Sequence, residues 1–299
     1  ISLGLVGSEM CIRDRSSPAT VVYPYPIVPF LAFAISKATV ADFVISLVYV
    51  FAYCTAVNLW NHINDAEIDV KFGDRNELLI LLQYKREAIA ITIFLYLLAF
   101  FVVLAKTNTL VTLCYTISVI ITWLYSDRIW VGKYIRRLKE NYILEIVTYS
   151  IVLPLSSIVL WCFFSELNYH CIVFSTIITV VLFSSVMLKD IKDISADLQA
   201  GYKTLAIVLP PEKLLQISLI FSYTYYILLF IFSCTLCLFP KFSAIGLFPL
   251  LLLIYSTFNL HKKSWEISFR TIKFIKIFVY SYVASLILMS AGAFYENFI

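Results

Sequence analysis

Charge is scarce in this sequence. Only 14% of its 299 residues are Asp, Glu, Lys or Arg, whereas 61% are hydrophobic and the mean hydropathy is +0.89. Ordinary soluble domains carry about 25% charged residues, so the composition excludes a soluble globular protein. The apolar residues also come in runs of about 17 to 25, the length that a helix needs to cross a bilayer. We therefore conclude that the chain is an integral membrane protein.

Glycine is scarce as well, with seven residues in the chain and no pair of them near the polar clusters described below. Ion-coupled transporters often contain inverted repeats and discontinuous helices broken at glycine, with their ion sites near the middle of the membrane. The scarcity of glycine argues against a transporter, which remains the main alternative from another class of function.

The first 15 residues, ISLGLVGSEMCIRDR, differ in composition from the rest of the chain. They are similar to a stretch that recurs at the ends of translated metagenomic reads. We expect residues 1–15 to be a non-native leader, comparable to a tag, and the natural N-terminus to be truncated or missing.

The apolar runs predict nine membrane-spanning segments. Backbone polar groups in lipid must be satisfied within the segment, so we expect all nine to be helices. The first contains three prolines and is expected to be kinked or partly re-entrant. The predicted segments cover residues 20–36, 41–62, 87–105, 108–125, 142–163, 170–188, 214–238, 242–260 and 271–293.

Basic residues are distributed very unevenly between the two sets of loops. One set has four Lys or Arg in 63–87, five in 126–141, four in 189–213 and five in 261–276. The opposite set has three, which are Lys37, Lys106 and Lys241. By the positive-inside rule, the basic loops face the cytoplasm.

Two clusters of polar residues lie on the predicted cytoplasmic side. The first acidic cluster is Asn61, Asp65 and Asp69, whose spacing of four places all three on one face if the helix continues through them. The second acidic cluster contains Asp190, Asp193 and Asp197 and is framed by Lys189 and Gly201. Carboxylates at the end of a membrane helix are costly unless they bind something.

The residue types in these clusters indicate a site for divalent cations and phosphate. Mg²⁺ prefers oxygen ligands and is usually held by one or two carboxylates together with substrate phosphates. Carboxylates on two helices suit a diphosphate held between two metal sites. Lys189, Lys203 and the basic residues of loop 126–141 would add positive charge around that group. A membrane location further favours a substrate with a long hydrocarbon tail.

At these residues the chain resembles the UbiA superfamily of intramembrane prenyltransferases. The first acidic cluster matches the signature N-x-x-x-D-x-x-x-D. The second cluster and its frame match Y-x-x-x-K-x-x-x-D-x-x-x-D-x-x-x-G, except that Ser185 stands in place of Tyr. Tyr125-Ser126, followed by Leu138-Lys139, is similar to a weaker family pattern. The resemblance covers roughly residues 20–299 and implies a single all-helical membrane domain of nine helices around a central cavity.

The resemblance also implies a reaction and roles for the residues. The expected activity is Mg²⁺-dependent transfer of a polyprenyl group from its diphosphate to an acceptor, with release of pyrophosphate. The expected metal-binding and catalytic residues are Asp65, Asp69, Asp193 and Asp197. The expected substrate-binding residues are Asn61, Lys189, Asp190, Lys203 and Lys139.

The acceptor stays open at this stage. Many family members carry R-P-L-x-x-G after the first signature, whereas residues 75–80 read RNELLI. An aromatic quinone precursor, a glycerol-phosphate lipid and a tetrapyrrole all suit the scaffold. An inactive family member that serves as a scaffold is a further alternative, against which the intact aspartates argue.

Overall fold

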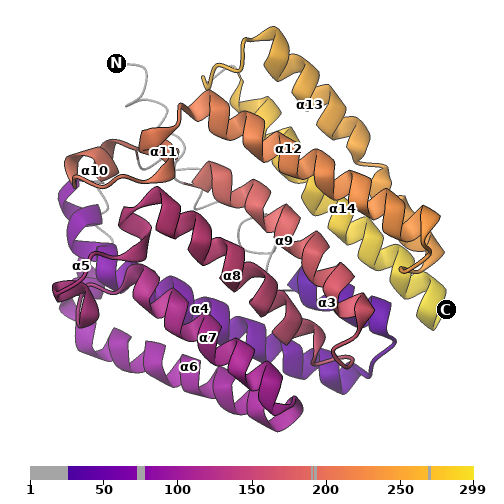
Figure 1. Cartoon of the computed structure of the whole chain (residues 1–299), viewed down its shortest axis with the longest axis horizontal. Coiled ribbons are helices and arrows are strands. Elements are labelled where there is room, and N and C mark those ends of the chain that lie inside the picture. Colours follow the sequence, from indigo (N-terminus) through magenta and orange to yellow (C-terminus); the bar gives the residue numbers. More distant parts are fainter. Residues whose placement is uncertain (1–25, 73–77, 190, 192–193, 269–270) are drawn as a thin grey trace.

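In the computed structural model, described for residues 26–72, 78–189, 191, 194–268 and 271–299, the chain is a bundle of long helices (Figure 1). The helices are α3 (Val28–Ser36), α4 (Val40–Phe72), α5 (Leu79–Gln83), α6 (Lys85–Lys106), α7 (Thr109–Ser126), α8 (Tyr142–Trp161), α9 (Tyr169–Lys189), α10 (Ile194–Gln199), α11 (Leu205–Val208), α12 (Pro211–Phe230), α13 (Leu250–Lys262) and α14 (Ile272–Phe298). The predicted all-helical membrane fold is confirmed.

Within the described ranges, eight segments are long and apolar enough to cross a membrane. The predicted count of nine is not confirmed, because the first predicted segment contributes only the nine-residue α3 to the described structure. A helix of that length covers roughly 14 Å, less than half of the apolar thickness of a bilayer.

The long helices pack in a closed ring. α4 packs on α6, α6 on α7, α7 on α8, α8 on α9 and α9 on α12. The 3₁₀ segment η7 (Lys241–Leu247) contacts both α12 and α14, and α14 contacts α3, which packs on α4. The amide of Asn297 in α14 donates to the carbonyl of Ala34 in α3 at 2.8 Å. The last described helix therefore lies beside the first described one.

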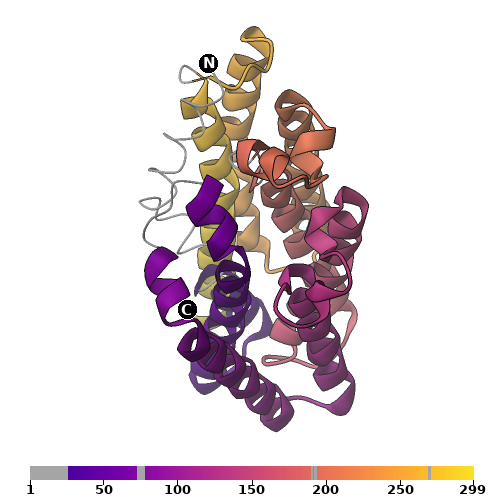
Figure 2. The same ribbon diagram turned by 90° about the vertical axis from the view of Figure 1, so that its left-hand side faces the viewer.

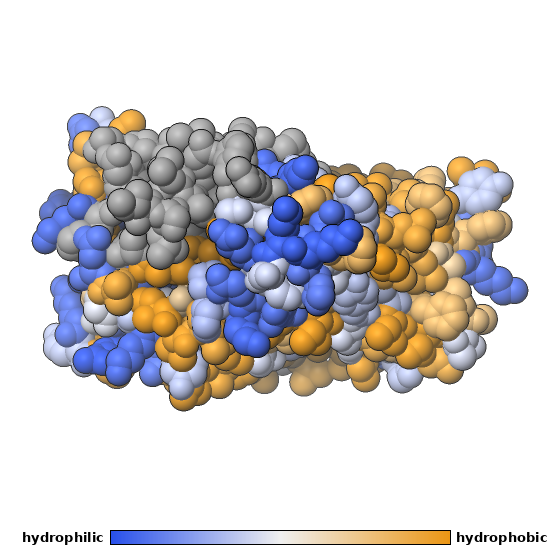
Figure 3. All heavy atoms as spheres, turned by 90° about the horizontal axis from the view of Figure 1, so that it is seen from above, coloured by the Kyte–Doolittle hydropathy of each residue, from blue (hydrophilic) through white to orange (hydrophobic). Residues whose placement is uncertain are grey.

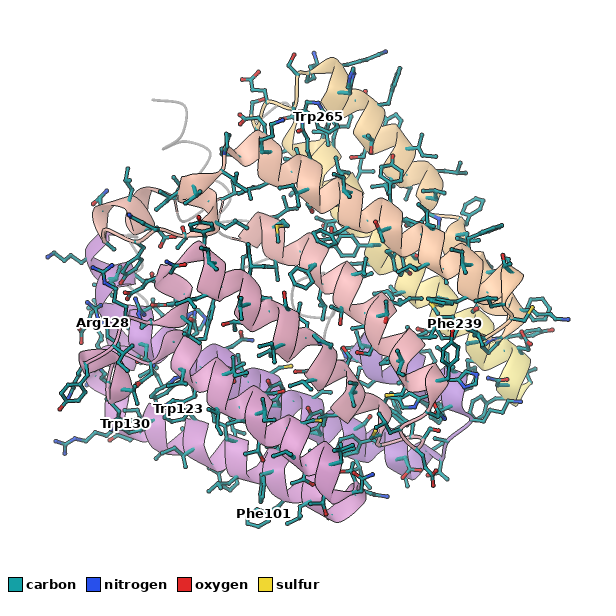
Figure 4. All side chains as sticks on the ribbon, viewed as in Figure 1. Phe101, Trp123, Arg128, Trp130, Phe239 and Trp265 are labelled. Carbon is teal, nitrogen blue, oxygen red and sulfur yellow. The ribbon has the colours of Figure 1, made fainter. Side chains whose placement is uncertain are left out.

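Apolar side chains cover much of the outside of this ring. On α6, Phe94 and Phe101 are about 60% exposed, and Phe101 points away from the bundle in Figure 4. The face seen in Figure 3 likewise has broad hydrophobic areas, with hydrophilic residues gathered in separate patches. Such apolar surface suits contact with lipid tails.

Inside the ring, small hydroxyl side chains join several helices. Ser184 of α9 lies within 3.0 Å of Ser218 and 2.8 Å of Ser222 on α12, and Ser285 of α14 lies 2.8 Å from the Tyr225 hydroxyl. Small residues allow membrane helices to approach closely, and hydroxyls that pair across helices satisfy each other's hydrogen bonds.

Helix α4 extends beyond its predicted apolar segment. We expected its apolar segment to end at residue 62, but the helix continues to Phe72 and has 33 residues. At 1.5 Å per residue it is about 50 Å long, so its last turns extend beyond a bilayer core of about 30 Å. The first acidic cluster lies on these last turns.

Candidate active site

The first acidic cluster lies on one continuous helix. Asn61, Asp65 and Asp69 are all in α4 and are all half-buried. The condition for placing them on one helical face is therefore met. The end of the bundle that carries them faces the viewer in Figure 2, together with α5, α10 and α11.

The loop between α7 and α8 is folded around one buried carboxylate. Asp127 is 1% exposed, and its oxygens accept backbone N–H bonds from four successive residues. These bonds come from Ile129 (3.0 Å), Trp130 (3.2 Å), Val131 (2.6 Å) and Gly132 (3.1 Å). A carboxylate that accepts this many backbone bonds fixes the course of the loop.

The same loop is tied to α4 beside the acidic cluster. Ser126 donates to the Asn61 side-chain oxygen at 2.8 Å, and the backbone N–H of Arg128 donates to the Asn64 side-chain oxygen at 2.7 Å. The indole rings of Trp123 and Trp130, labelled in Figure 4, lie close together. Both stack on Trp60 of α4, with ring centroids 3.9 and 5.4 Å away. The loop is therefore held against the helix that carries the carboxylates.

Arg137 joins Asp65 of the first cluster to Tyr202, the residue that follows the second cluster's frame. Its side chain is 1% exposed and donates to Asp65 Oδ1 at 2.8 Å and to Glu140 Oε1 at 2.7 Å. It also donates to the Tyr202 hydroxyl at 2.5 Å, and its guanidinium lies 5.2 Å from the Tyr202 ring centroid. The planar guanidinium, with several fixed donors, suits this three-way contact. Sequence reasoning did not separate Arg137 from the other basic residues of the loop.

Lys139 lies on the other side of the Asp65 carboxylate. Its ammonium donates to Asp65 Oδ2 and, at 2.9 Å, to Asn61 Oδ1. The side chains of Lys139 and Asp65 are each 15% exposed. The structure thus brings together three of the predicted site residues, Asn61, Asp65 and Lys139.

Burial and neighbouring charges shift the pKa values of the groups that surround Asp65 in different directions. Burial lowers the pKa of Lys139, and the neighbouring Asp65 offsets only part of this shift. Burial also opposes the charge of Arg137, but Asp65, Tyr202 and Glu140 outweigh it and raise its pKa. Burial raises the pKa of Tyr202, against the opposing charge of Arg137. Arg137 therefore stays charged and Tyr202 stays protonated near neutral pH.

The second acidic cluster is described only in part. α9 ends at Lys189, and Asp197 lies on the separate short helix α10, so the described residues of this cluster do not share one helix. Asp197 accepts a hydrogen bond from the Thr204 hydroxyl at 3.0 Å. The predicted residues Asp190 and Asp193 lie outside the described residues.

Backbone bonds connect the second cluster to the loop that carries Arg137 and Lys139. The N–H of Lys203 donates to the carbonyl of Glu140 at 3.1 Å, and the N–H of Tyr142 donates to the carbonyl of Lys203 at 2.9 Å. The side chain of Lys203 is exposed, and its predicted role in substrate binding stays a prediction.

A second polar group lies where α7, α8 and α9 meet. Lys189 lies 2.7 Å from Glu145 and donates to the Tyr125 hydroxyl at 2.8 Å, and Tyr125 donates to Glu145 at 3.1 Å. The ammonium also lies 5.0 Å from the Tyr149 ring centroid. Sequence reasoning missed Glu145, although it is the one acidic residue in the predicted segment 142–163. A carboxylate inside a predicted span is itself a signal of function.

Replacing Glu145 by Gln is expected to weaken the hold on Lys189. Lys189 is 33% exposed and can turn toward water, so we expect a moderate effect, with affinity for the prenyl diphosphate reduced roughly tenfold. The measurement is KM for the diphosphate. Glu67→Gln is the matched control, because Glu67 is 65% exposed in its 3.2 Å pair with Lys85. Unchanged KM in Glu145→Gln would contradict this role.

Ser185, where the family pattern has Tyr, faces a tyrosine of another helix. Its hydroxyl, on α9, lies 2.9 Å from the hydroxyl of Tyr282 on α14, within hydrogen-bonding distance.

The donor set fits a hard divalent cation. Asn61, Asp65, Asp69 and Asp197 all offer oxygen, the ligand that Mg²⁺ prefers. Asp65 already attracts two cationic side chains, so the cluster needs positive charge. In the part of the chain that the structure describes, no three His, Cys, Asp or Glu residues are close enough together to hold a metal by themselves. Asp190 and Asp193, outside that part, are the predicted completion.

A separate cavity of about 380 Å³ lies at the opposite end of the bundle. Asp65 is 25 residues from the first residue of α4, which is about 38 Å along the helix, whereas the cavity lies beside that start. Its lining includes Lys37, Trp161, His170, Phe239, Lys241 and Glu296. The cavity is thus remote from the acidic clusters.

The chain matches the UbiA prenyltransferase family over residues 24–282. The chain belongs to this family. The resemblance seen in the sequence motifs is thereby confirmed, and because members of the family are prenyltransferases, the chain is an enzyme of that class rather than a transporter. An uncharacterized protein from Archaeoglobus fulgidus is 37% identical over 287 residues, which cover 94% of this chain and 97% of that protein.

Solved structures of UbiA homologues share the fold. A digeranylgeranylglyceryl phosphate synthase is 19% identical, with a TM-score of 0.64 over 90% of this chain and 92% of that one. A UbiA homologue from Archaeoglobus fulgidus, bound to DMAPP and Mg²⁺, is 16% identical, with a TM-score of 0.58 over 91% and 96% of the two chains. At these identities the likeness establishes the fold alone.

Proposed function

We propose that this prenyltransferase transfers a polyprenyl group from its diphosphate to an aromatic or lipid acceptor in a Mg²⁺-dependent reaction that releases pyrophosphate. The observation that carries the proposal is the meeting of carboxylates and cations at one end of the bundle, where Asp65 contacts Arg137 and Lys139. A UbiA homologue with the same fold binds DMAPP and Mg²⁺, which supports this choice of substrate and cation. Retention of the acidic residues argues against an inactive scaffold.

We assign the roles within the site from the family resemblance, with which the chemistry of the residues agrees. Asp65, Asp69, Asp193 and Asp197 would hold Mg²⁺, with Asn61 and Asp190 as supporting contacts. When bound, Mg²⁺ neutralises the negative charge that develops on the departing pyrophosphate. Lys139, Lys189 and Lys203 would contact the diphosphate as point charges.

The remaining side chains position these groups. The loop bonds to Asp127 and Asn64 hold Lys139 beside the carboxylates, and Glu145 holds Lys189 at the end of α9. Groups fixed in this way lose little freedom when the substrate binds, which favours reaction. The excess of basic residues in the loops at this end supports a site that opens to the cytoplasm.

The test is pyrophosphate release by the full chain in nanodiscs, with geranylgeranyl diphosphate and a panel of acceptors. The panel contains an aromatic acid, a prenylated glycerol phosphate and a tetrapyrrole, each with and without Mg²⁺. Release that requires both Mg²⁺ and one acceptor is expected. Absence of release and of diphosphate binding in the folded protein would overturn the proposal.

A further inference from the structure

We propose that, when no metal is bound, the Lys139 ammonium occupies the position of a divalent cation on the first acidic cluster. Arg137, in contrast, is a permanent positioning residue for Asp65. This inference rests on the proposed function. The Lys139 ammonium contacts Asn61 Oδ1 at 2.9 Å and Asp65 Oδ2, which come from residues four apart on α4. Both are hard oxygens that we assign to metal binding or its support. One cationic side chain therefore occupies the position where a metal would bind.

The two cations compete for the same oxygen. A carboxylate oxygen that accepts a close bond from an ammonium holds a divalent cation less favourably, because the two positive charges would lie only a few ångströms apart and repel each other. On this proposal Lys139 moves off Asp65 Oδ2 when the cation binds. Lysine suits this movement because its charge sits on a flexible four-carbon chain. The diphosphate that enters with the cation is the anion that would receive the ammonium.

Arg137 is expected to keep its position when the cation binds. Its side chain is 1% exposed, compared with 15% for Lys139. It is bonded to three segments, namely α4 through Asp65, its own loop through Glu140, and the α10–α11 connection through Tyr202. Displacement would leave a buried guanidinium without partners, which is costly.

The oxygens of Asp65 are therefore divided between the two basic residues. Oδ1 is committed to Arg137, and Oδ2 passes from Lys139 to the cation. Asp65 would bind metal through one oxygen only, in an orientation set by Arg137. The carboxylate also has a counter-charge at every stage, so the buried site never holds an unpaired charge.

The experiment separates binding of the cation from catalysis. Mn²⁺, which shares the oxygen preference of Mg²⁺, is titrated calorimetrically into the full chain in nanodiscs without substrate. Lys139→Met is expected to tighten Mn²⁺ binding roughly tenfold, because a competing charge is removed. The same variant is expected to weaken binding of pyrophosphate in the presence of Mg²⁺ roughly tenfold. Tighter Mn²⁺ binding together with weaker pyrophosphate binding is the result expected of a lysine that the cation displaces.

Two further variants complete the design. Lys85→Met removes an exposed lysine that pairs with Glu67 at 3.2 Å and is expected to change neither affinity. Arg137→Lys keeps the charge but loses the three-way contact with Asp65, Glu140 and Tyr202. We therefore expect weaker binding of both Mn²⁺ and pyrophosphate.

The outcomes distinguish the two proposals. Unchanged or weaker Mn²⁺ binding in Lys139→Met, with clear binding in the unmodified chain, would overturn this inference and leave the proposed function intact. If the unmodified chain binds Mn²⁺ neither alone nor together with pyrophosphate, both this inference and the proposed function are overturned. Retention of both affinities in Arg137→Lys would overturn the positioning role.

Discussion

Replacing Asp65 by Asn is expected to reduce Mg²⁺-dependent pyrophosphate release by roughly 100-fold or more. The substitution keeps the shape of the side chain but removes the charge that attracts a cation. It also leaves Arg137 and Lys139 facing a neutral amide. Because Glu140 still contacts Arg137, we expect a stability loss of about 2 kcal/mol. This is less than the loss of ~3–5 kcal/mol that is typical when one partner of a buried ion pair is removed.

The matched control is Asp42→Asn on the same helix. Asp42 pairs with Lys106 at 2.9 Å, with side chains 22% and 36% exposed, near the opposite end of α4. Such a pair contributes about 0.2–1 kcal/mol, and the variant is expected to retain full turnover. Both variants are compared by steady-state kinetics and by thermal unfolding in the same nanodiscs. Full turnover in Asp65→Asn would remove this residue from the site.

Replacing Gly132 by Ala is expected to disable the loop that carries Arg137 and Lys139. A Cβ atom on Gly132 would lie 1.9 Å from the carbonyl oxygen of Asp127 and 2.7 Å from its carbonyl carbon. Backbone cannot give way as a flexible side chain does, so the turn around Asp127 must open. A displacement of about 1 Å in positioned groups can lower turnover roughly 100-fold. We expect a loss of that size, with a stability loss of about 3 kcal/mol.

Gly292→Ala is the control, because it creates a clash of similar severity away from this loop. Its Cβ would lie 2.1 Å from the carbonyl oxygen of Phe242, where α14 packs on η7. This variant is expected to lose stability but to keep its turnover per folded molecule. Turnover is therefore normalised to the folded fraction, measured by size-exclusion chromatography of a fluorescent fusion. Equal normalised turnover in Gly132→Ala and the unmodified chain would refute the role of the loop.

The sequence predicts much of the fold because hydrophobic length determines membrane helices directly. The four-residue spacing of Asn61, Asp65 and Asp69 also specifies a helical face, and α4 indeed runs through all three. The apolar segment is predicted to end at residue 62, and the helix continues beyond it to Phe72. Polar residues end an apolar run without ending the helix.

The arrangement around Asp65 could not be predicted in the same way. Arg137 is one of five basic residues in its loop, and nothing in the local pattern marks it as the buried one. Its position depends on Asp127, which turns the chain, and on Tyr202, which lies 65 residues further on. Contacts between distant segments leave no periodic pattern in a sequence. The contact between Ser185 and Tyr282 is hidden for the same reason.

The closure of the ring by α14 also has a consequence for biogenesis. Helices of a membrane protein are made and inserted in chain order, and α14 is the last described helix to leave the ribosome. Until it packs on α3 and Asn297 reaches the carbonyl of Ala34, the ring of helices is not closed on that side. Of the eight described segments long enough to span a membrane, seven therefore precede the one that closes the ring. We expect this incomplete ring to be more open to proteolysis than the finished bundle.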